Sequence, residues 1–176
     1  MRAPFAPVEV KLRSDRRVLL REVQEDDGDA FLAAWRGLSE DSRYTRFMSP
    51  VRDASPRMLE RATHPDAQTE LQLVAVAHGA EHEEIVGGAR YAGAPGSRDC
   101  EFAITIVDAW QGQGLARALL EALMGAARER GYECMEGYIL ASNAPMLGLA
   151  KKLGFKPAPS PEGPAVRLMR CDLRAR

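Results

Sequence analysis

The sequence feature that most constrains the fold is a glycine-bearing turn between an apolar run and a long helical pattern. Residues 102–107 predict a buried strand, and residues 115–130 carry apolar side chains at helical spacing. The turn between them contains Gly112 and Gly114. The first turn of a helix has unpaired backbone N–H groups and partial positive charge. We therefore expect an anion site at residues 112–117, and phosphate is the anion most often bound in such a place.

Two common phosphate-binding motifs do not match this turn. A Walker loop ends in Gly-Lys-Ser/Thr, whereas Gly114 is followed by Leu115 and Ala116. A dinucleotide fingerprint needs a third glycine at the position of Arg117. A Gly-x-Gly turn before a helix is also often only a connection. The turn taken alone therefore leaves phosphate binding and a purely structural role open.

A second segment, residues 143–155, reads as a short helix with Asn143 as its N-cap and Gly154 as its end. Together the two segments resemble the GNAT superfamily of acetyl-CoA-dependent N-acetyltransferases. The first family motif, Gln/Arg-x-x-Gly-x-Gly/Ala, is matched by residues 111–116, and the second, an Asn followed by a short helix and Gly-Phe, by residues 143–155. The resemblance covers roughly residues 18–172.

The pattern along the chain predicts an α+β fold. We expect strands at residues 18–22, 71–78, 85–91, 100–107, 132–140 and 165–173, with helices between them. This order predicts a mixed, mostly antiparallel central sheet with helices on both faces. The resemblance adds a splayed strand pair that receives the cofactor. We expect residues 1–17 to be an N-terminal extension and residues 18–173 to form a single GNAT-like domain, with 157–164 as a proline-rich loop.

Composition is typical of a globular protein outside the membrane. The chain has 176 residues, 45% hydrophobic and 28% charged, with a formal net charge of −1. This balance predicts neither a nucleic-acid partner nor a membrane partner. The three cysteines and three histidines are dispersed, so we expect reduced thiols, no metal site and a cytoplasmic location. We expect a monomer or a homodimer.

The resemblance implies acetyl-CoA as the acyl donor. Its pyrophosphate would lie on the glycine turn and its pantetheine arm along the strand before that turn. The cofactor-binding residues implied in this way are Ile104, Thr105, Ile106, Gln111, Gly112, Gln113, Gly114, Leu115, Ala116, Arg117 and Asn143.

Acetyl transfer to an amine requires a neutral nitrogen, and an amine of pKa about 10.4 is almost fully protonated at pH 7. Deprotonation costs roughly 4.6 kcal/mol, so a nearby carboxylate is expected as general base. Glu101 is our candidate, because strand alternation places it on one face with Ala103 and Thr105, next to the implied acetyl end. The alternative is an edge glutamate that faces water.

The general acid is not assigned by the sequence. Many GNAT enzymes carry a tyrosine seven residues after the motif asparagine, and this chain has Ala150 there. Tyr138 and Tyr44 are the replacements considered, although each also fits a packing role.

The segment 38–47, together with residues 100–104 and the tyrosine-free helix, resembles the bacterial protein lysine acetyltransferases of the Pat type. In that group the glutamate matching Glu101 is taken as the general base. A protein lysine is therefore the favoured acceptor. The alternatives are a small-molecule amine acetyltransferase, a non-catalytic acyl-CoA-binding sensor and a nucleotide-binding regulatory module.

Overall fold

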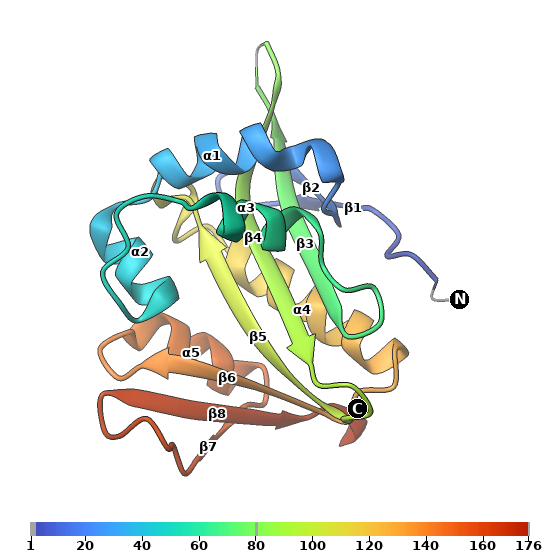
Figure 1. Ribbon diagram of the computed structural model, residues 1–176, viewed down its shortest axis with the longest axis vertical. Coiled ribbons are helices and arrows are strands. Elements are labelled where there is room, and N and C mark those ends of the chain that lie inside the picture. Colours follow the sequence, from blue (N-terminus) through green and yellow to red (C-terminus); the bar gives the residue numbers. More distant parts are fainter. Residues whose placement is uncertain (1–2, 80, 176) are drawn as a thin grey trace.

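The computed structural model describes residues 3–79 and 81–175 (Figure 1). In these ranges eight strands form one sheet in the order β1-β2-β3-β4-β5-β6-β8-β7. The β5–β6 pair is parallel and every other neighbouring pair is antiparallel. The strands are β1 (Val8–Lys11), β2 (Arg17–Glu22), β3 (Glu70–His78), β4 (Glu83–Gly93), β5 (Asp99–Ile106), β6 (Cys134–Leu140), β7 (Lys156–Ala158) and β8 (Val166–Asp172).

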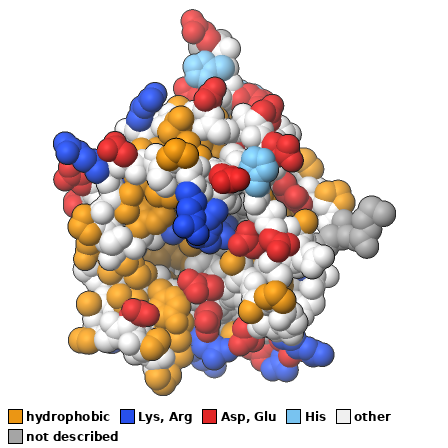
Figure 2. Space-filling model, viewed as in Figure 1, with side chains coloured by type: hydrophobic (Ala, Val, Ile, Leu, Met, Phe, Trp, Pro, Cys, Tyr) orange, Lys and Arg blue, Asp and Glu red, His pale blue; other side chains and the backbone are white. Residues whose placement is uncertain are grey.

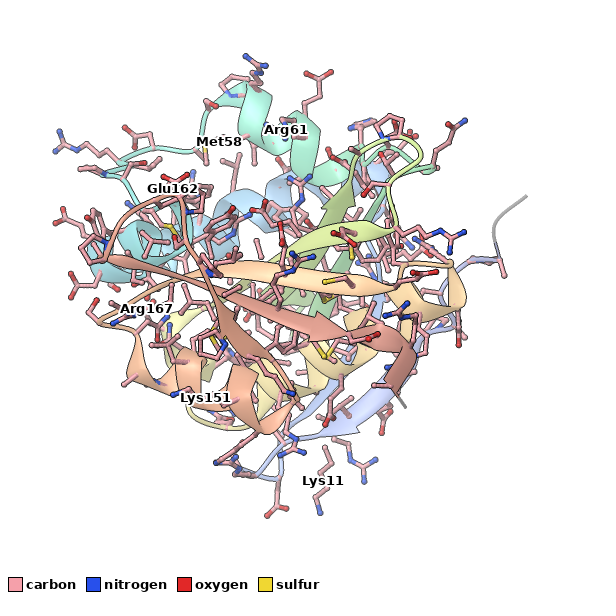
Figure 3. All side chains as sticks on the ribbon, turned by 90° about the horizontal axis from the view of Figure 1, so that it is seen from below. Lys11, Met58, Arg61, Lys151, Glu162 and Arg167 are labelled. Carbon is pink, nitrogen blue, oxygen red and sulfur yellow. The ribbon has the colours of Figure 1, made fainter. Side chains whose placement is uncertain are left out.

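Helices cover both faces of this sheet, as the sequence predicts. One face carries α1 (Gly28–Arg36), α2 (Glu40–Phe47) and α3 (Pro56–Thr63), and the other carries α4 (Leu115–Glu129) and α5 (Ala144–Lys152). Figure 3 shows this separation from below, with Met58 and Arg61 of α3 on one side of the strands and Lys151 of α5 on the other. Ser39 and Ser55 cap α2 and α3, each accepting a backbone N–H bond three residues later.

The core explains why the central strands are so apolar. Seven consecutive residues of β3, 71–77, are buried, because helices cover both faces of that strand. Helix α4 buries Leu115, Leu119, Leu120 and Leu123 at helical spacing against the sheet. Removing these side chains from water is the main force that holds α4 on the sheet.

Two segments differ from the sequence prediction. Residues 8–11, expected in an N-terminal extension, form β1 and pair with β2 as an edge strand of the same sheet. Residues 157–158, expected in the proline-rich loop, belong to β7 and pair with β8. Both strands are short and largely exposed: β7 has no apolar alternation, and that of β1 runs over only four residues, which is too short to reveal a strand in a sequence.

Within the described ranges, no helix has both the length and the apolar character that crossing a membrane requires.

Candidate active site

The candidate site lies where β5 and β6 separate. The two strands pair in register only over residues 99–101 and 134–136, ending at Glu101 opposite Glu136. We call the point where this pairing ends the fork. Beyond the fork, an open cleft of about 1220 Å³ lies between the strands. Because β5 continues to pair with β4 up to Ile106, its other edge faces the cleft and presents backbone groups to it.

The Phe102 ring packs against the backbone of β6 just beyond the last paired residues. A Cβ added to Gly137 of β6 would lie 2.3 Å from the Phe102 ring, so this ring occupies the space beside the glycine backbone. Phe155 packs edge-on against Phe102, with ring centroids 5.3 Å apart. The fork is therefore built into the packing of the core.

The glycine turn forms the far end of the cleft. Gly112 and Gly114 have φ values of +74° and +91°, a left-handed conformation that side-chain-bearing residues rarely adopt. Gly114 is the N-cap of α4, and no side chain caps this helix end. The N-terminus of α4 therefore directs uncapped backbone N–H groups and partial positive charge at the cleft.

Most of the predicted cofactor residues line this one cleft. Those that do are Ile104, Thr105, Ile106, Gln111, Gly112, Gly114, Leu115, Ala116, Arg117 and Asn143. Gln113 does not: its side chain bonds to Ser14 and to the Ala109 carbonyl, behind the turn.

The polar side chains of the turn also stabilise it. Gln111 Nε2 donates to the Ile106 carbonyl at 3.0 Å and to Ser42 Oγ at 3.1 Å, joining the turn to β5 and α2. Arg117 pairs with Glu121 at 3.1 Å, and both side chains are about half exposed.

Asn143 lies on the opposite wall. Its Oδ1 accepts the Met146 N–H at 3.3 Å and caps α5, as predicted. Gly154, with φ of +95°, follows the last residues of that helix, which also agrees with the prediction.

Glu101 lies at the fork itself. Its carboxylate is exposed to the cleft, and its pKa is raised, first by partial burial and second by the negative charge of Glu136. Arg46 and Arg90 oppose this rise. A carboxyl group of raised pKa beside an open cleft is chemically suited to accept a proton near neutral pH.

The structure separates the two tyrosines considered as general acids. Tyr138 lines the cleft on β6, and burial raises its pKa, with Glu136 and Glu101 adding to the effect. Tyr44 is exposed and does not line the cleft. Ala150, where many relatives carry a tyrosine, is fully buried in the core.

Sequence reasoning missed three charged residues near Glu101, which are Arg46, Arg90 and Glu136. Glu136 could have been found from the alternation of its strand, which puts it on one face with Tyr138. Arg46 lies in the segment 38–47, where the sequence gives no ground for preferring it to Arg43 or Tyr44. The structure distinguishes them: Arg43 ties α2 to the Trp35 and Arg52 carbonyls, Tyr44 faces solvent, and Arg46 faces the cleft.

Among the residues described, no three His, Cys, Asp or Glu side chains come together in a way that could hold a metal ion.

Comparison with known proteins identifies the family to which the chain belongs. The family profile described as an acetyltransferase (GNAT) domain matches residues 17–156. Acetyltransferase PA5475 of Pseudomonas aeruginosa is 34% identical over 144 residues, which cover 82% of this chain and 77% of that protein. A mycothiol acetyltransferase of Jonesia denitrificans is 33% identical over 138 residues, covering 74% of this chain but only 40% of that protein.

Solved structures show the same fold. The GNAT domain of S. lividans PAT matches with a TM-score of 0.86 and 29% identity, covering 94% of this chain and 96% of that one. The yncA protein of Salmonella typhimurium, solved with acetyl-CoA, has a TM-score of 0.69 and 20% identity, covering 90% and 95% of the two chains. This chain belongs to the GNAT family of N-acetyltransferases.

Proposed function

We propose that the protein transfers the acetyl group of acetyl-CoA to a primary amine by direct attack, with Glu101 as general base. The observation that carries this proposal is the position of Glu101 at the fork, next to a cleft that ends at an uncapped helix N-terminus. The cytoplasmic location stays an expectation from the sequence.

The cleft residues fit the donor. Phosphate groups suit the N–H groups of residues 112–117, since the left-handed glycines leave the backbone open to close approach. The free edge of β5 at Ile104–Ile106 suits the amide groups of the pantetheine arm, which can pair with a strand as a neighbouring chain would. Asn143 faces this arm from the other wall.

In the proposed reaction, Glu101 takes a proton from the attacking amine, directly or through one water. Its raised pKa brings it closer to that of the amine, which reduces the cost of the transfer. Tyr138 is our candidate to protonate the departing sulfur, because it lines the cleft and a tyrosine hydroxyl carries its proton at neutral pH.

Two acceptor classes remain in the proposal. The sequence resemblance to Pat-type enzymes and the structural likeness to the S. lividans PAT domain support a protein lysine. A small-molecule amine is the second candidate, and a pocket of limited volume that adjoins the cleft lined by Glu101 favours it. A non-catalytic acyl-CoA sensor is the alternative to both.

The Glu101→Gln variant tests the mechanism. The amide keeps the size of the side chain but cannot accept the proton, so turnover at pH 7 should fall by on the order of 10²–10⁴ while acetyl-CoA still binds. The defect should shrink as pH rises, because neutral amine becomes more abundant. CoA release with a panel of amines measures both effects.

Glu129→Gln provides the control, since it removes an exposed carboxylate at the end of α4, outside the cleft lining. Near-normal turnover of Glu101→Gln would remove Glu101 from the mechanism. Acetyl-CoA binding without CoA release from any amine would instead favour the sensor.

A further inference from the structure

A second cavity, of about 200 Å³, lies beneath α1, α2 and α3 on the Glu101 face of the sheet. We call it the arginine pocket. It adjoins the fork cleft, because Arg46, Phe47, Ala103 and Thr105 line both spaces. Figure 2 shows a hollow on this face, with hydrophobic side chains beside it, basic side chains along its upper edge and acidic side chains along its lower edge. A group that enters the arginine pocket therefore lies next to the proposed reaction centre.

The walls of the arginine pocket are mostly apolar. Helices α1 and α3 supply the larger side chains, and the small residues Gly87, Gly88 and Ala89 of β4 leave room at the floor. A cavity of about 150 Å³ with apolar walls is large enough to hold benzene. The arginine pocket is therefore large enough for an aromatic ring or a branched aliphatic chain. The apolar wall residues are Phe31, Ala34, Trp35, Leu38, Met58, Leu59 and Ala62.

The charged side chains that line the arginine pocket in the described chain are all arginines: Arg46, Arg61 and Arg90. Arg90 is paired with Glu70 at 2.9 Å. For Arg46 the described residues record no ion pair, and its ring contact is with its neighbour Phe47. Arg61, labelled on α3 in Figure 3, is exposed and likewise has no ion pair among the described residues. Arg46 and Arg61 therefore make no direct ion pair among the described residues, and the charge that acts on Arg46 from nearby is that of Glu101, the proposed base.

Arg46 is the arginine of this pocket that also lines the fork cleft, where the reaction centre is proposed. Burial, and after it the positive charge of Arg90, lower the pKa of Arg46 to about 10 against the opposing effect of Glu101. Arg46 is thus still a cation at neutral pH, although it is partly removed from water. A bound anion would compensate this loss of hydration, because charge-assisted bonds to a guanidinium are strong.

We propose that the arginine pocket is the acceptor subsite, and that the acceptor is a small amine bearing both a carboxylate and a bulky apolar group, such as an apolar α-amino acid. In such a molecule one carbon carries the amine and the carboxylate. Glu101 receives the amine, Arg46 binds the carboxylate, and the apolar group fills the pocket. The inference rests on the acetyltransferase function proposed above and develops its second acceptor class.

Acceptor specificity of the wild-type enzyme is the first test. CoA release is measured with phenylalanine, leucine and tryptophan, with their amides, with glycine and with a lysine-containing peptide. The free apolar amino acids should exceed both their amides and glycine by at least about tenfold in kcat/KM, because the amide lacks the anion and glycine lacks the apolar group.

Two variants locate the effect. Arg46→Met should raise KM for the apolar amino acids at least about tenfold, and Arg46→Lys should restore part of the loss. Ala62→Trp, which fills the pocket from α3, should have a similar effect while acetyl-CoA affinity stays unchanged. The matched controls are Arg57→Gln, which removes an exposed arginine of α3, and Ala33→Trp on the exposed side of α1, and neither residue lines the pocket.

The outcomes distinguish a failure of this inference from a failure of the proposed acetyltransferase function. If the lysine peptide is the best acceptor and Ala62→Trp does not affect it, the inference is overturned and the acetyltransferase proposal stands. If no amine is acetylated and calorimetry detects no binding of the apolar amino acids, both fail. Should Ala62→Trp not fold, the comparison of acids with amides on the wild-type enzyme still decides.

Discussion

Glu101 and Glu136 form the last register pair between β5 and β6, which places two carboxylates at the fork. Glu136 is also 3.4 Å from the Arg170 guanidinium, so it is held in place on β6. Glu136 is the second cause of the raised pKa of Glu101, after burial. It is therefore a positioning and tuning residue for the proposed base.

Glu136→Gln should move the acidic limb of the pH profile of kcat/KM toward lower pH. The reason is that Glu101 must be ionised to act, and losing a neighbouring negative charge lowers its pKa. Rates measured between about pH 5 and pH 9 check this, with Glu129→Gln as the charge-loss control. An unmoved limb would show that Glu136 does not tune the base.

Gly114→Val should weaken acetyl-CoA binding by at least about tenfold. Only a glycine readily holds a φ of +91°, so valine distorts the turn and also places a side chain where phosphate is expected. Calorimetric titration measures the affinity. Gly125→Val, inside α4 with no atom within 4 Å of its added Cβ, is the matched control. Full affinity in the Gly114 variant would remove the turn from the donor site.

At the scale of elements, the fork depends on a close contact between two strands. Phe102 of β5 lies against the backbone of Gly137 in β6, and Phe155, the residue before β7, packs edge-on against the Phe102 ring. Any side chain at position 137 meets the ring, so the separation of the strands and the stability of the core are coupled.

Gly137→Ala should destabilise the fold by about 1–3 kcal/mol, the usual cost of overpacking a core. Chemical denaturation measures this directly. Gly125→Ala should behave in the opposite way, because alanine is favoured in a helix and nothing lies within 4 Å of the added Cβ. Equal stability of the Gly137→Ala variant and the wild type would mean that the Phe102 ring moves aside at little cost.

At the scale of the whole molecule, one ion pair joins the sheet to the helical layer that covers it. Arg21 of β2 donates to both oxygens of Asp27, at 2.8 and 2.9 Å, just before α1. The backbone N–H of Gln24 also donates to Asp27. Burial alone would raise the pKa of Asp27, but these hydrogen bonds outweigh it and lower the pKa.

Asp27→Asn should cost roughly 2–3 kcal/mol of stability at pH 7, because it removes the charge from a largely buried, doubly bonded pair. The pKa of Asp27 is depressed in the folded state, so its contribution is present above the unfolded pKa and is lost as pH falls through the folded value. The difference in unfolding free energy between the variant and the wild type should therefore shrink as the pH is lowered from neutral to acidic. A constant difference across that range would contradict the assignment.

The local parts of this protein could be predicted from the sequence. The glycine turn, the helix that follows it, the Asn143 cap and the Gly154 end each depend on residues within one or two turns of chain. Their conformational preferences act over the same short distances, so they can be recognised without a structure. The two short edge strands could not, because their pairing partners supply the stability that their own side chains lack.

Only the tertiary structure decided what surrounds Glu101. Arg46 comes from α2, Arg90 from β4 and Glu136 from β6, and no spacing in the chain predicts that these side chains meet. The arginine pocket likewise depends on three helices crossing the small residues of β4. The sequence alone determined the class of fold and the family motifs, because these reside in local patterns. The charges around the reaction centre and the space beside it follow from long-range packing.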